Sequence, residues 1–278
     1  MRPLLSRSLA LGAALYLGGC ATVSSQAPTP SEPAPPPAPP QAAAPAEPPA
    51  PTSVPARPLQ QPKPAQLVVQ ARPDSPIVSL RLVFHSGSVD DPKGKEGLGA
   101  LTAALLSEGG TQSLTSAQVL EALFPMAAEL HASTDKEFTV FSGRVHKDFL
   151  PRFLELFTDV LLKPRFDPQE FERLRTRALS DLRNGLRSED DELLGKVALD
   201  ALLYEGHPAA HYVGGTEQGL QALTLEDMKA HAARVFTQDR LVIGLAGPVD
   251  EALQSTVVSR LSALPATGAP RVELPPVP

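Results

Sequence analysis

The segment from Ala21 to Ala65 most restricts what this chain can fold into. It holds 16 of the chain's 31 prolines and no aromatic residue. Proline lacks a backbone N–H group, and a segment without large apolar side chains has no core to bury. We therefore expect a polyproline-II-biased spacer, about 140 Å long if fully extended at about 3.1 Å per residue, with the folded domain after it.

Residues 1–20 have the pattern of an export signal. Arg2 and Arg7 precede an apolar run from Leu9 to Leu17 that is too short to span a membrane. Two glycines and Cys20 follow, which resembles the lipobox of a bacterial lipoprotein, and the resemblance implies lipidation of Cys20. Because Ala21 follows rather than Asp, we expect an outer-membrane lipoprotein facing the periplasm of a Gram-negative bacterium. An ordinary secretory signal is the alternative.

The charge of residues 66–278 limits the kinds of partner. They carry 21 Lys and Arg against 29 Asp and Glu, a net charge of −8. Nucleic acids and anionic membranes are bound through positive patches, so an acidic domain argues against both as partners. The sequence also has no Gly-rich phosphate loop and no Gly-x-Ser-x-Gly motif. A single cysteine excludes an intrachain disulfide.

The order of expected elements predicts the fold class. Ile77 to Phe84 alternates apolar and polar residues as a half-buried strand does, and Asp250 to Leu261 reads as a final helix. The order is strand, strand, helix, helix, strand, strand, several helices, one strand and that last helix. This predicts an α+β domain over residues 66–264, with a mainly antiparallel sheet and helices packed on one face. Residues 265–278 read as a Pro-rich tail or the start of an interdomain linker.

Gly97 to Leu106 reads Gly-Leu-Gly-Ala-Leu-Thr-Ala-Ala-Leu-Leu after a Gly- and Asp-rich loop. Taken alone it is an alanine-rich helix. With its preceding strand and loop, it resembles the zinc helix of the pitrilysin/insulinase family, Gly-Leu-Ala-His-Phe-Leu-Glu-His-Met-Leu, which carries the inverted His-x-x-Glu-His motif. The two histidines fall on Ala100 and Ala104, and the glutamate falls on Ala103. A methyl group neither binds zinc nor takes a proton, so we expect no metal, no cofactor and no catalytic residue here.

Two further motifs resemble the family and depart from it. His131, Ala132, Ser133 and Thr134 lie where the family has Asn-Ala-x-Thr, on an edge strand that holds an extended peptide. The resemblance makes these residues a possible peptide-binding strand, with His131 in place of the asparagine.

The second motif lies in a helical segment expected from Asp167 to Arg187. The family has two glutamates seven residues apart there, and the second is its third zinc ligand. They fall on Leu174 and on Asp181, which lies 77 positions after Ala104. The simpler interpretation of Asp181 is a solvated charge on a helix face.

Two later segments also follow the family's order. His207-Pro208 to Thr216-Glu217 resembles a His-Pro-Tyr-Gly…Gly-Thr loop, and Pro208 favours a turn over a helix carrying a histidine pair. Thr224 and Asp227 form a capping-box pattern at the start of a helix. The remaining histidines have no partner at ligand spacing, so we assign them no chemistry.

The resemblance implies a function for an emptied site. Some enzymes of the family consist of two chains of which one holds zinc, so we expect a non-catalytic homologue that pairs with an active zinc peptidase. A stand-alone peptide- or protein-binding module at the outer membrane is the alternative, and an active zinc metalloendopeptidase is the least favoured. Family members normally carry two such domains, so this chain is either a one-domain protein or a fragment of a longer one.

Overall fold

The computed structural model describes residues 65–270 and 273–276. The predicted signal peptide, Cys20 and nearly all of the predicted Pro-rich spacer lie outside the described residues. The strands are β1 (Gln66–Ala71), β2 (Ile77–Phe84), β3 (Glu129–Thr134), β4 (Thr139–His146) and β5 (Leu241–Gly247). The α-helices are α1 (Leu98–Glu108), α2 (Ser116–Leu123), α3 (Leu150–Leu162), α4 (Pro168–Ser180), α5 (Asp191–Leu203), α6 (Glu217–Ala222), α7 (Leu225–Val235) and α8 (Glu251–Leu261).

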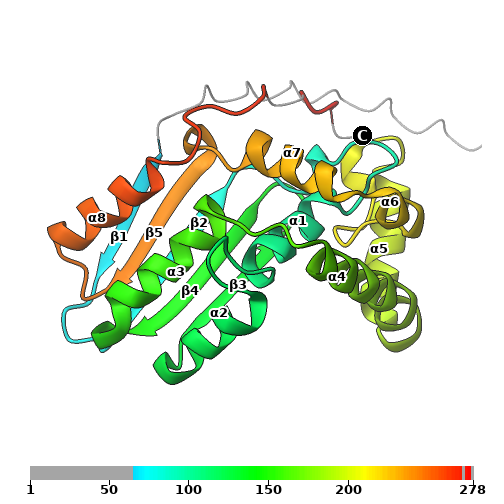
Figure 1. The fold of residues 1–278 in the computed structure, drawn as a ribbon. Coiled ribbons are helices and arrows are strands. Elements are labelled where there is room, and N and C mark those ends of the chain that lie inside the picture. The colour runs from blue at the N-terminus through cyan, green and yellow to red at the C-terminus, as the bar shows by residue number, and fades with distance from the viewer. Residues whose placement is uncertain (1–64, 271–272, 277–278) are drawn as a thin grey trace, which may run out of the picture. The chain divides into compact units, whose positions relative to one another are not determined.

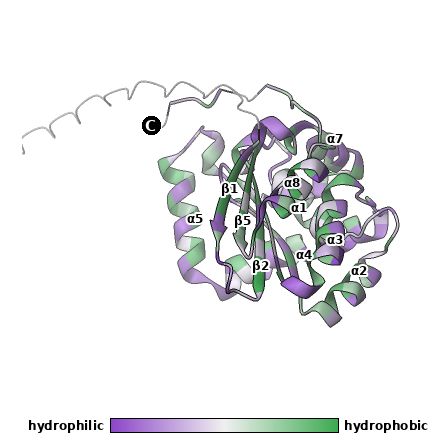
Figure 2. Cartoon of the chain, turned by 90° about the vertical axis from the view of Figure 1, so that its left-hand side faces the viewer, coloured by the Kyte–Doolittle hydropathy of each residue, from purple (hydrophilic) through white to green (hydrophobic). Residues whose placement is uncertain are grey.

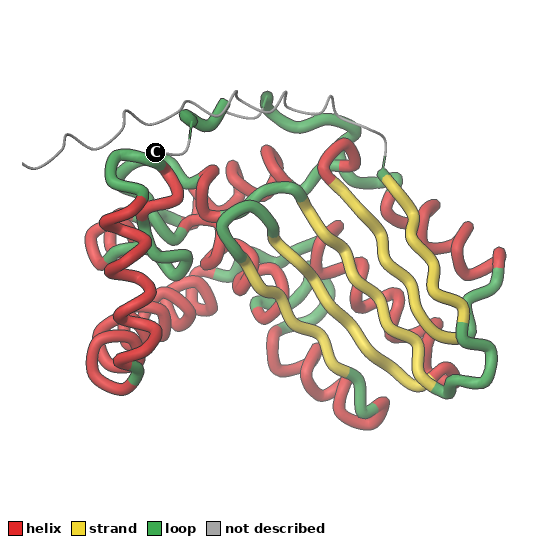
Figure 3. The backbone as a smooth tube through the Cα atoms, turned by 180° about the vertical axis from the view of Figure 1, so that it is seen from behind, coloured by secondary structure: helices red, strands yellow, loops and turns green. Residues whose placement is uncertain are grey.

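The five strands form one sheet in the order β1-β5-β2-β4-β3 (Figure 3). β2 pairs antiparallel with both β4 and β5, and β3 pairs antiparallel with β4. β1 pairs with β5 in parallel, so the sheet is mixed but mainly antiparallel. This confirms the predicted element order and fold class.

One face of the sheet is covered by helices and the other is open. Along β2, Val78, Leu80, Leu82 and Phe84 are buried, whereas Arg81 between them is exposed. Successive side chains of a strand point to opposite faces, so this alternation marks the covered face. Figures 1 and 2 show α3, α8 and α1 lying on that face, which confirms the prediction of helices packed on one side.

Two apolar clusters build the interior and meet at α1. The sheet-side cluster joins the covered face of the sheet to α3 and the ends of α7 and α8, and its largest members are Phe84, Phe141, Phe153, Phe157 and Phe236. The hairpin-side cluster joins α1 to α4, α6, α7 and the segment that follows α4, and its largest members are Leu98, Leu101, Leu105, Phe171, Leu174, Leu220 and Met228. Phe166, between α3 and α4, is partly buried against both clusters.

The segment after α4 departs from the expected continuous helix. α4 ends at Ser180, and Asp181–Glu189 continue as a π-helix, here called η4. Gly185 lies within it, and glycine is the poorest helix former after proline. α4, η4 and α5 together form a helical hairpin at the end of the domain away from β1 and β5 (Figure 1).

The caps of the later helices agree with the sequence. Thr224 accepts the backbone N–H of Asp227, and the Asp227 side chain accepts that of Thr224, so the predicted capping box is confirmed. Thr216 and Asp250 cap α6 and α8. Within the described part of the chain, no helix is both long and apolar enough to cross a membrane.

Candidate functional site

The start of α1 is held by a carboxylate from the preceding loop. The Asp91 side chain is fully buried, and its two oxygens accept the backbone N–H groups of Gly97 and Gly99, each at 2.8 Å. The first N–H groups of a helix have no partner inside the helix, so Asp91 satisfies two groups there. Burial raises the pKa of Asp91, while the hydrogen bonds and the nearby His211 act in the opposite direction.

His211 lies against this buried carboxylate. Its Nε2 atom is 3.6 Å from Asp91 Oδ2, too long for a good hydrogen bond. Lys136 fixes the loop that carries His211, because its Nζ donates to the carbonyl oxygens of Ala209 at 2.8 Å and His211 at 2.5 Å. The sequence gives no signal for these contacts, since the residues lie far apart along the chain.

Two glycines bring the same loop against the start of α1. Gly97 and Gly215 both have left-handed backbone angles, with φ of 102° and 93°. A Cβ atom on Gly215 would lie 2.3 Å from Glu96 O and 2.7 Å from Gly97 Cα. Only glycine avoids both the positive-φ penalty and these clashes. At Gly215 the loop is therefore packed main chain to main chain against Glu96 and Gly97, directly before α1.

A hollow of about 170 Å³ lies between α1 and the helical hairpin. Ala100 and Ala104 line it from α1, and Leu174 and Asp181 line it from α4 and η4. The other lining residues are Gly97, Leu101, Arg177, Ala178, Leu182, Tyr212, Gly214 and Leu220. The zinc-helix motif and the glutamate motif name five positions between them. Four of the five lie together at this hollow.

Ala103 lies apart from them. It is 2 % exposed and belongs to the sheet-side cluster, whereas Ala104 packs against the hairpin-side cluster. Neighbouring helix positions differ by about 100° around the axis, so the two alanines point to different halves of the domain. The spacing of the motif did not distinguish these directions.

The side chains of the hollow offer few metal ligands. Ala100, Ala104 and Leu174 carry no donor atom, and Asp181 is the one carboxylate in the lining. Among the described residues, no three His, Cys, Asp or Glu side chains gather closely enough to hold a metal ion. Zinc sites use three or four N, O or S ligands, so the lining does not fit the zinc ion of the family motif.

Asp181 is an exposed carboxylate beside an arginine and a tyrosine. Its negative charge contributes to raising the pKa of Arg177, although the hydrogen bond from Arg177 to Glu108 is the larger cause. Burial raises the pKa of Tyr212, and the charge of Asp181 adds to that effect. These contacts agree with the simpler interpretation of Asp181 as a helix-face charge.

β3 is an outer strand of the sheet, as the predicted peptide-binding strand requires. His131 and Ser133 are exposed and lie opposite Ser142 and Val140 of β4, whereas Ala132 packs towards the sheet-side cluster. Beside the end of the strand, a second, more open hollow is lined by Val83, Ser133, Thr134, Asp135, Phe138 and Val140. The free edge and this hollow lie next to each other.

The histidines at 207 and 211 do not form a metal pair. His207 Nδ1 accepts the backbone N–H of Ala209 at 3.0 Å, and its Nε2 lies 3.1 Å from the carbonyl oxygen of Pro275. A short 3-10 turn, η5 (Pro208–Ala210), separates the two histidines. This confirms the turn that Pro208 predicts.

Comparisons with known proteins agree with this arrangement. The family model described as Insulinase (Peptidase family M16) matches residues 66–216. The "non-peptidase homolog YmxG" of Helicobacter pylori is 28 % identical over 182 residues, which are 64 % of this chain and 41 % of the relative. A mitochondrial-processing peptidase subunit beta of Dictyostelium discoideum is 24 % identical over 174 residues, 63 % of this chain and 37 % of that one.

Among solved structures, a peptidase M16 inactive domain from Pseudomonas fluorescens superposes with a TM-score of 0.70 and 25 % identity. That match covers 77 % of this chain and 52 % of the other. The chain therefore spans about half, or less, of the length of these relatives.

Proposed function

The chain belongs to the insulinase (M16) peptidase family, and we propose that it is a catalytically inactive member that acts as the partner subunit of an active zinc peptidase. One observation carries the proposal. At the hollow beside α1, the two positions that hold imidazoles in the family motif are the methyl groups of Ala100 and Ala104, which share the hollow with Leu174 and Asp181. The fold around the family's site is kept while its metal chemistry is lost.

The substitutions at the positions of the family's zinc ligands and glutamate support the loss of both steps of zinc hydrolysis. Activation of a water molecule requires a metal held by several ligands, and proton transfer requires a general base. Ala103, at the position of the family glutamate, is buried against the sheet-side cluster and offers neither. The role of the domain is therefore one of binding.

The helical hairpin carries a surface that supports a protein partner. Leu199, Leu202 and Leu203 of α5 are 53 %, 72 % and 56 % exposed. They lie at i, i+3 and i+4 spacing, so they share one side of the helix. Contiguous exposed apolar residues mark interaction surfaces. α5 contacts η4, which lines the hollow, and η5 in the loop that packs against the start of α1, so a partner bound here would lie on the same side of the domain as the family's catalytic position.

The free edge of β3 supports a second contact, with an extended peptide. An added strand would pair with the backbone of Glu129–Thr134, and the hollow at Ser133, Thr134 and Phe138 would accept a side chain. We propose that this edge positions peptide for the active partner. The stand-alone binding module differs in needing no peptidase partner, and the active-enzyme alternative has the least support because the hollow lacks ligands.

We also propose that lipidation at Cys20 tethers the chain to the outer membrane, with residues 21–65 as spacer. This follows from the lipobox pattern in the sequence. Replacing Cys20 by Ser should move the chain from the membrane fraction to the soluble fraction. An unchanged membrane fraction would contradict lipidation.

Restoring the ligands tests the emptied site. The variant Ala100→His/Ala104→His/Asp181→Glu should take up zinc stoichiometrically, measured by elemental analysis after dialysis, whereas the parent chain should not. A matched control is Ala100→His/Ala103→His/Asp181→Glu, which adds the same groups but points one imidazole to the sheet side. Zinc uptake by the control as well, or by neither variant, would contradict the assignment of this hollow as the family's metal position. Zinc with chelator-sensitive peptide cleavage in the parent would establish an active enzyme instead.

Isolation in mild detergent tests the partner. The parent chain should recover an M16 protein with an intact His-x-x-Glu-His motif, and Leu199→Gln/Leu202→Gln/Leu203→Gln should lose it. The control Leu120→Gln/Phe124→Gln changes exposed apolar residues on α2 and directly after it instead, and it should keep the partner. Peptide binding at β3 without any peptidase in the isolate would favour the stand-alone module.

A further inference from the structure

The outer strand β1 lacks the features that keep edge strands apart. All six residues from Gln66 to Ala71 are exposed, and Val68 is 58 % exposed. The strand contains no charged residue and no proline. Unpaired edges normally carry lysine, proline or a bulge, because their free N–H and C=O groups otherwise pair with another chain. β1 is thus open to strand addition.

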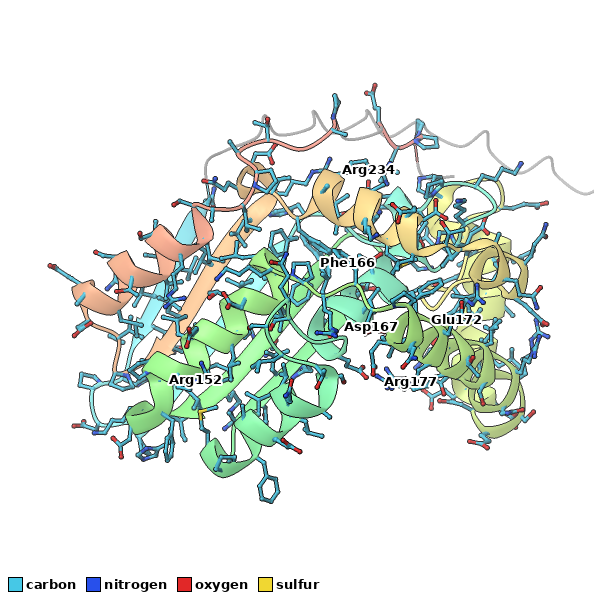
Figure 4. The ribbon with its side chains drawn as sticks, viewed as in Figure 1. Arg152, Phe166, Asp167, Glu172, Arg177 and Arg234 are labelled. Atoms are coloured by element: carbon cyan, nitrogen blue, oxygen red, sulfur yellow. The ribbon has the colours of Figure 1, made fainter. Side chains whose placement is uncertain are left out.

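The helix beside β1 is also poor in charge. α8 lies over β1 and β5 on the covered face of the sheet (Figures 1 and 3). Its exposed residues between the ends of the helix are Ala252, Ser255, Thr256, Val258 and Ser259. By contrast, α4 exposes Glu172, Arg173 and Arg177, of which Figure 4 labels Glu172 and Arg177. Depletion of charge is the compositional mark of an interface core.

We propose that β1 pairs antiparallel with β1 of a second copy of this chain, about a two-fold axis at Val68. In that register Gln66 lies opposite the second Gln70, Leu67 lies opposite the second Val69, and Val68 meets its own counterpart. Amide faces amide and aliphatic faces aliphatic at every position, and no like charges meet. The types of side chain along Gln66–Gln70 are the same in both directions, and such a self-complementary strand can form a closed two-fold dimer.

The two faces of β1 show what the dimer would bury. Leu67 and Val69 lie opposite Ile243 and Leu245 of β5, which are buried, so they belong to the covered face. Pairing would shield both residues and bring the two α8 helices close together. A strand pair alone buries less than the roughly 1,200 Å² of a stable interface, so the contact between the helices is needed as well. The two five-stranded sheets would then form one sheet of ten strands.

This dimer is independent of the proposed function. β3 is at the opposite edge of the sheet from β1, so both copies keep a free β3 edge. The leucines of α5 also lie on the hairpin and not at β1. Loss of self-association would therefore leave peptidase pairing intact. Loss of peptidase pairing would likewise leave self-association intact.

Cross-linking tests the register. In the full chain carrying Cys20→Ser, Val68→Cys supplies a single thiol at the two-fold axis. Residues directly opposite in antiparallel strands have Cα atoms about 4.5–5.5 Å apart, within disulfide range. Copper-phenanthroline oxidation should convert Val68→Cys to a covalent dimer. The matched variant Ser133→Cys, on the other free edge, should form no covalent dimer under the same oxidation. Equal cross-linking of both variants, or none at position 68, would overturn the proposal.

Sedimentation equilibrium tests the association without a cross-link. The full chain should have twice the mass of one chain, and Val68→Lys should have the mass of one, because two ammonium groups would meet at the axis. Circular dichroism should be unchanged, since Val68 is exposed. Ser133→Lys should remain a dimer. A monomeric parent chain, or a dimer that Val68→Lys does not dissociate, would overturn the proposal.

Discussion

The two halves of the domain that meet at α1 differ in what their residues contribute. On the sheet side, Phe153 and Phe157 are 0 % and 1 % exposed and close-packed under β4. On the hairpin side, a hollow lies between α1 and the hairpin, the segment after α4 is a π-helix, and Leu202 is 72 % exposed. The larger buried cluster lies on the sheet side, while the hairpin side also has exposed apolar surface available for binding.

The largest expected effect is on the sheet side. Phe157→Ala should lower the free energy of unfolding by about 3–5 kcal/mol, because it removes a fully buried ring and leaves a cavity. Urea denaturation measures this. Phe124→Ala, at an 85 % exposed phenylalanine, is the control and should change it by less than about 0.5 kcal/mol. Equal losses of unfolding free energy in both variants would contradict a core contribution of Phe157.

The second effect depends on pH and concerns His231 of α7. Burial, and then the charges of Arg234 and Arg240, lower its pKa from 6.5 to about 3. Between these values the unfolded state binds the proton and the folded state does not, so stability rises with pH. It is lost as pH falls from 6.5 to about 3, by an amount on the order of 2–4 kcal/mol.

The variant His231→Gln should flatten this part of the stability-pH profile, measured by urea denaturation at a series of pH values. The control is His131→Gln on β3, at an exposed site, and it should leave the profile unchanged. A profile that keeps its slope in His231→Gln would show that another group is responsible.

The third effect concerns the junction between the halves. Asp91→Ala should lower the free energy of unfolding by about 1–3 kcal/mol, because the N–H groups of Gly97 and Gly99 would lose their acceptor in a buried position. Thermal unfolding measures it. Asp90→Ala should cost less, since Asp90 accepts only one longer bond, 3.3 Å from the N–H of Gly87. An equal loss of stability in Asp90→Ala would contradict a particular contribution of the two buried hydrogen bonds of Asp91.

The smallest effect belongs to the hairpin surface. Leu199→Gln, Leu202→Gln and Leu203→Gln should each change the free energy of unfolding by less than about 0.5 kcal/mol, since these side chains are already exposed. Urea denaturation of the isolated chain measures it. A loss near that of Phe157→Ala would mean that α5 is part of the core and would remove the contrast between the halves.

Local signals in the sequence predicted most of the fold. The limits of β2 coincide with the alternating run Ile77–Phe84, and the capping box at Thr224 and Asp227 marks the start of α7. Each signal depends on residues within a few positions of one another. The π-helix after Ser180 was missed because its hydrogen-bond register is not fixed by local composition.

The site was predicted in part. The resemblance to the family's zinc helix and glutamate motif indicated which positions of α1, α4 and η4 belong to one site, and the hollow contains Ala100, Ala104, Leu174 and Asp181. The direction of Ala103 and the contact of His211 with Asp91 depend on packing between segments distant along the chain. The exposure of both faces of β1 likewise depends on its position at the edge of the sheet. The sequence of this segment predicts a strand but does not show that the strand is exposed.

The contact between Gly97 and Gly215 has a consequence for how such a domain can change over evolutionary time. It fixes α1 by main-chain atoms, and the two φ angles and the close approach involve no side chain of the hollow. Substitutions at 100, 103 and 104 leave that contact unchanged. A lineage could therefore discard the reactive groups in any order without first losing the architecture, and the same frame remains available for acquiring different ones.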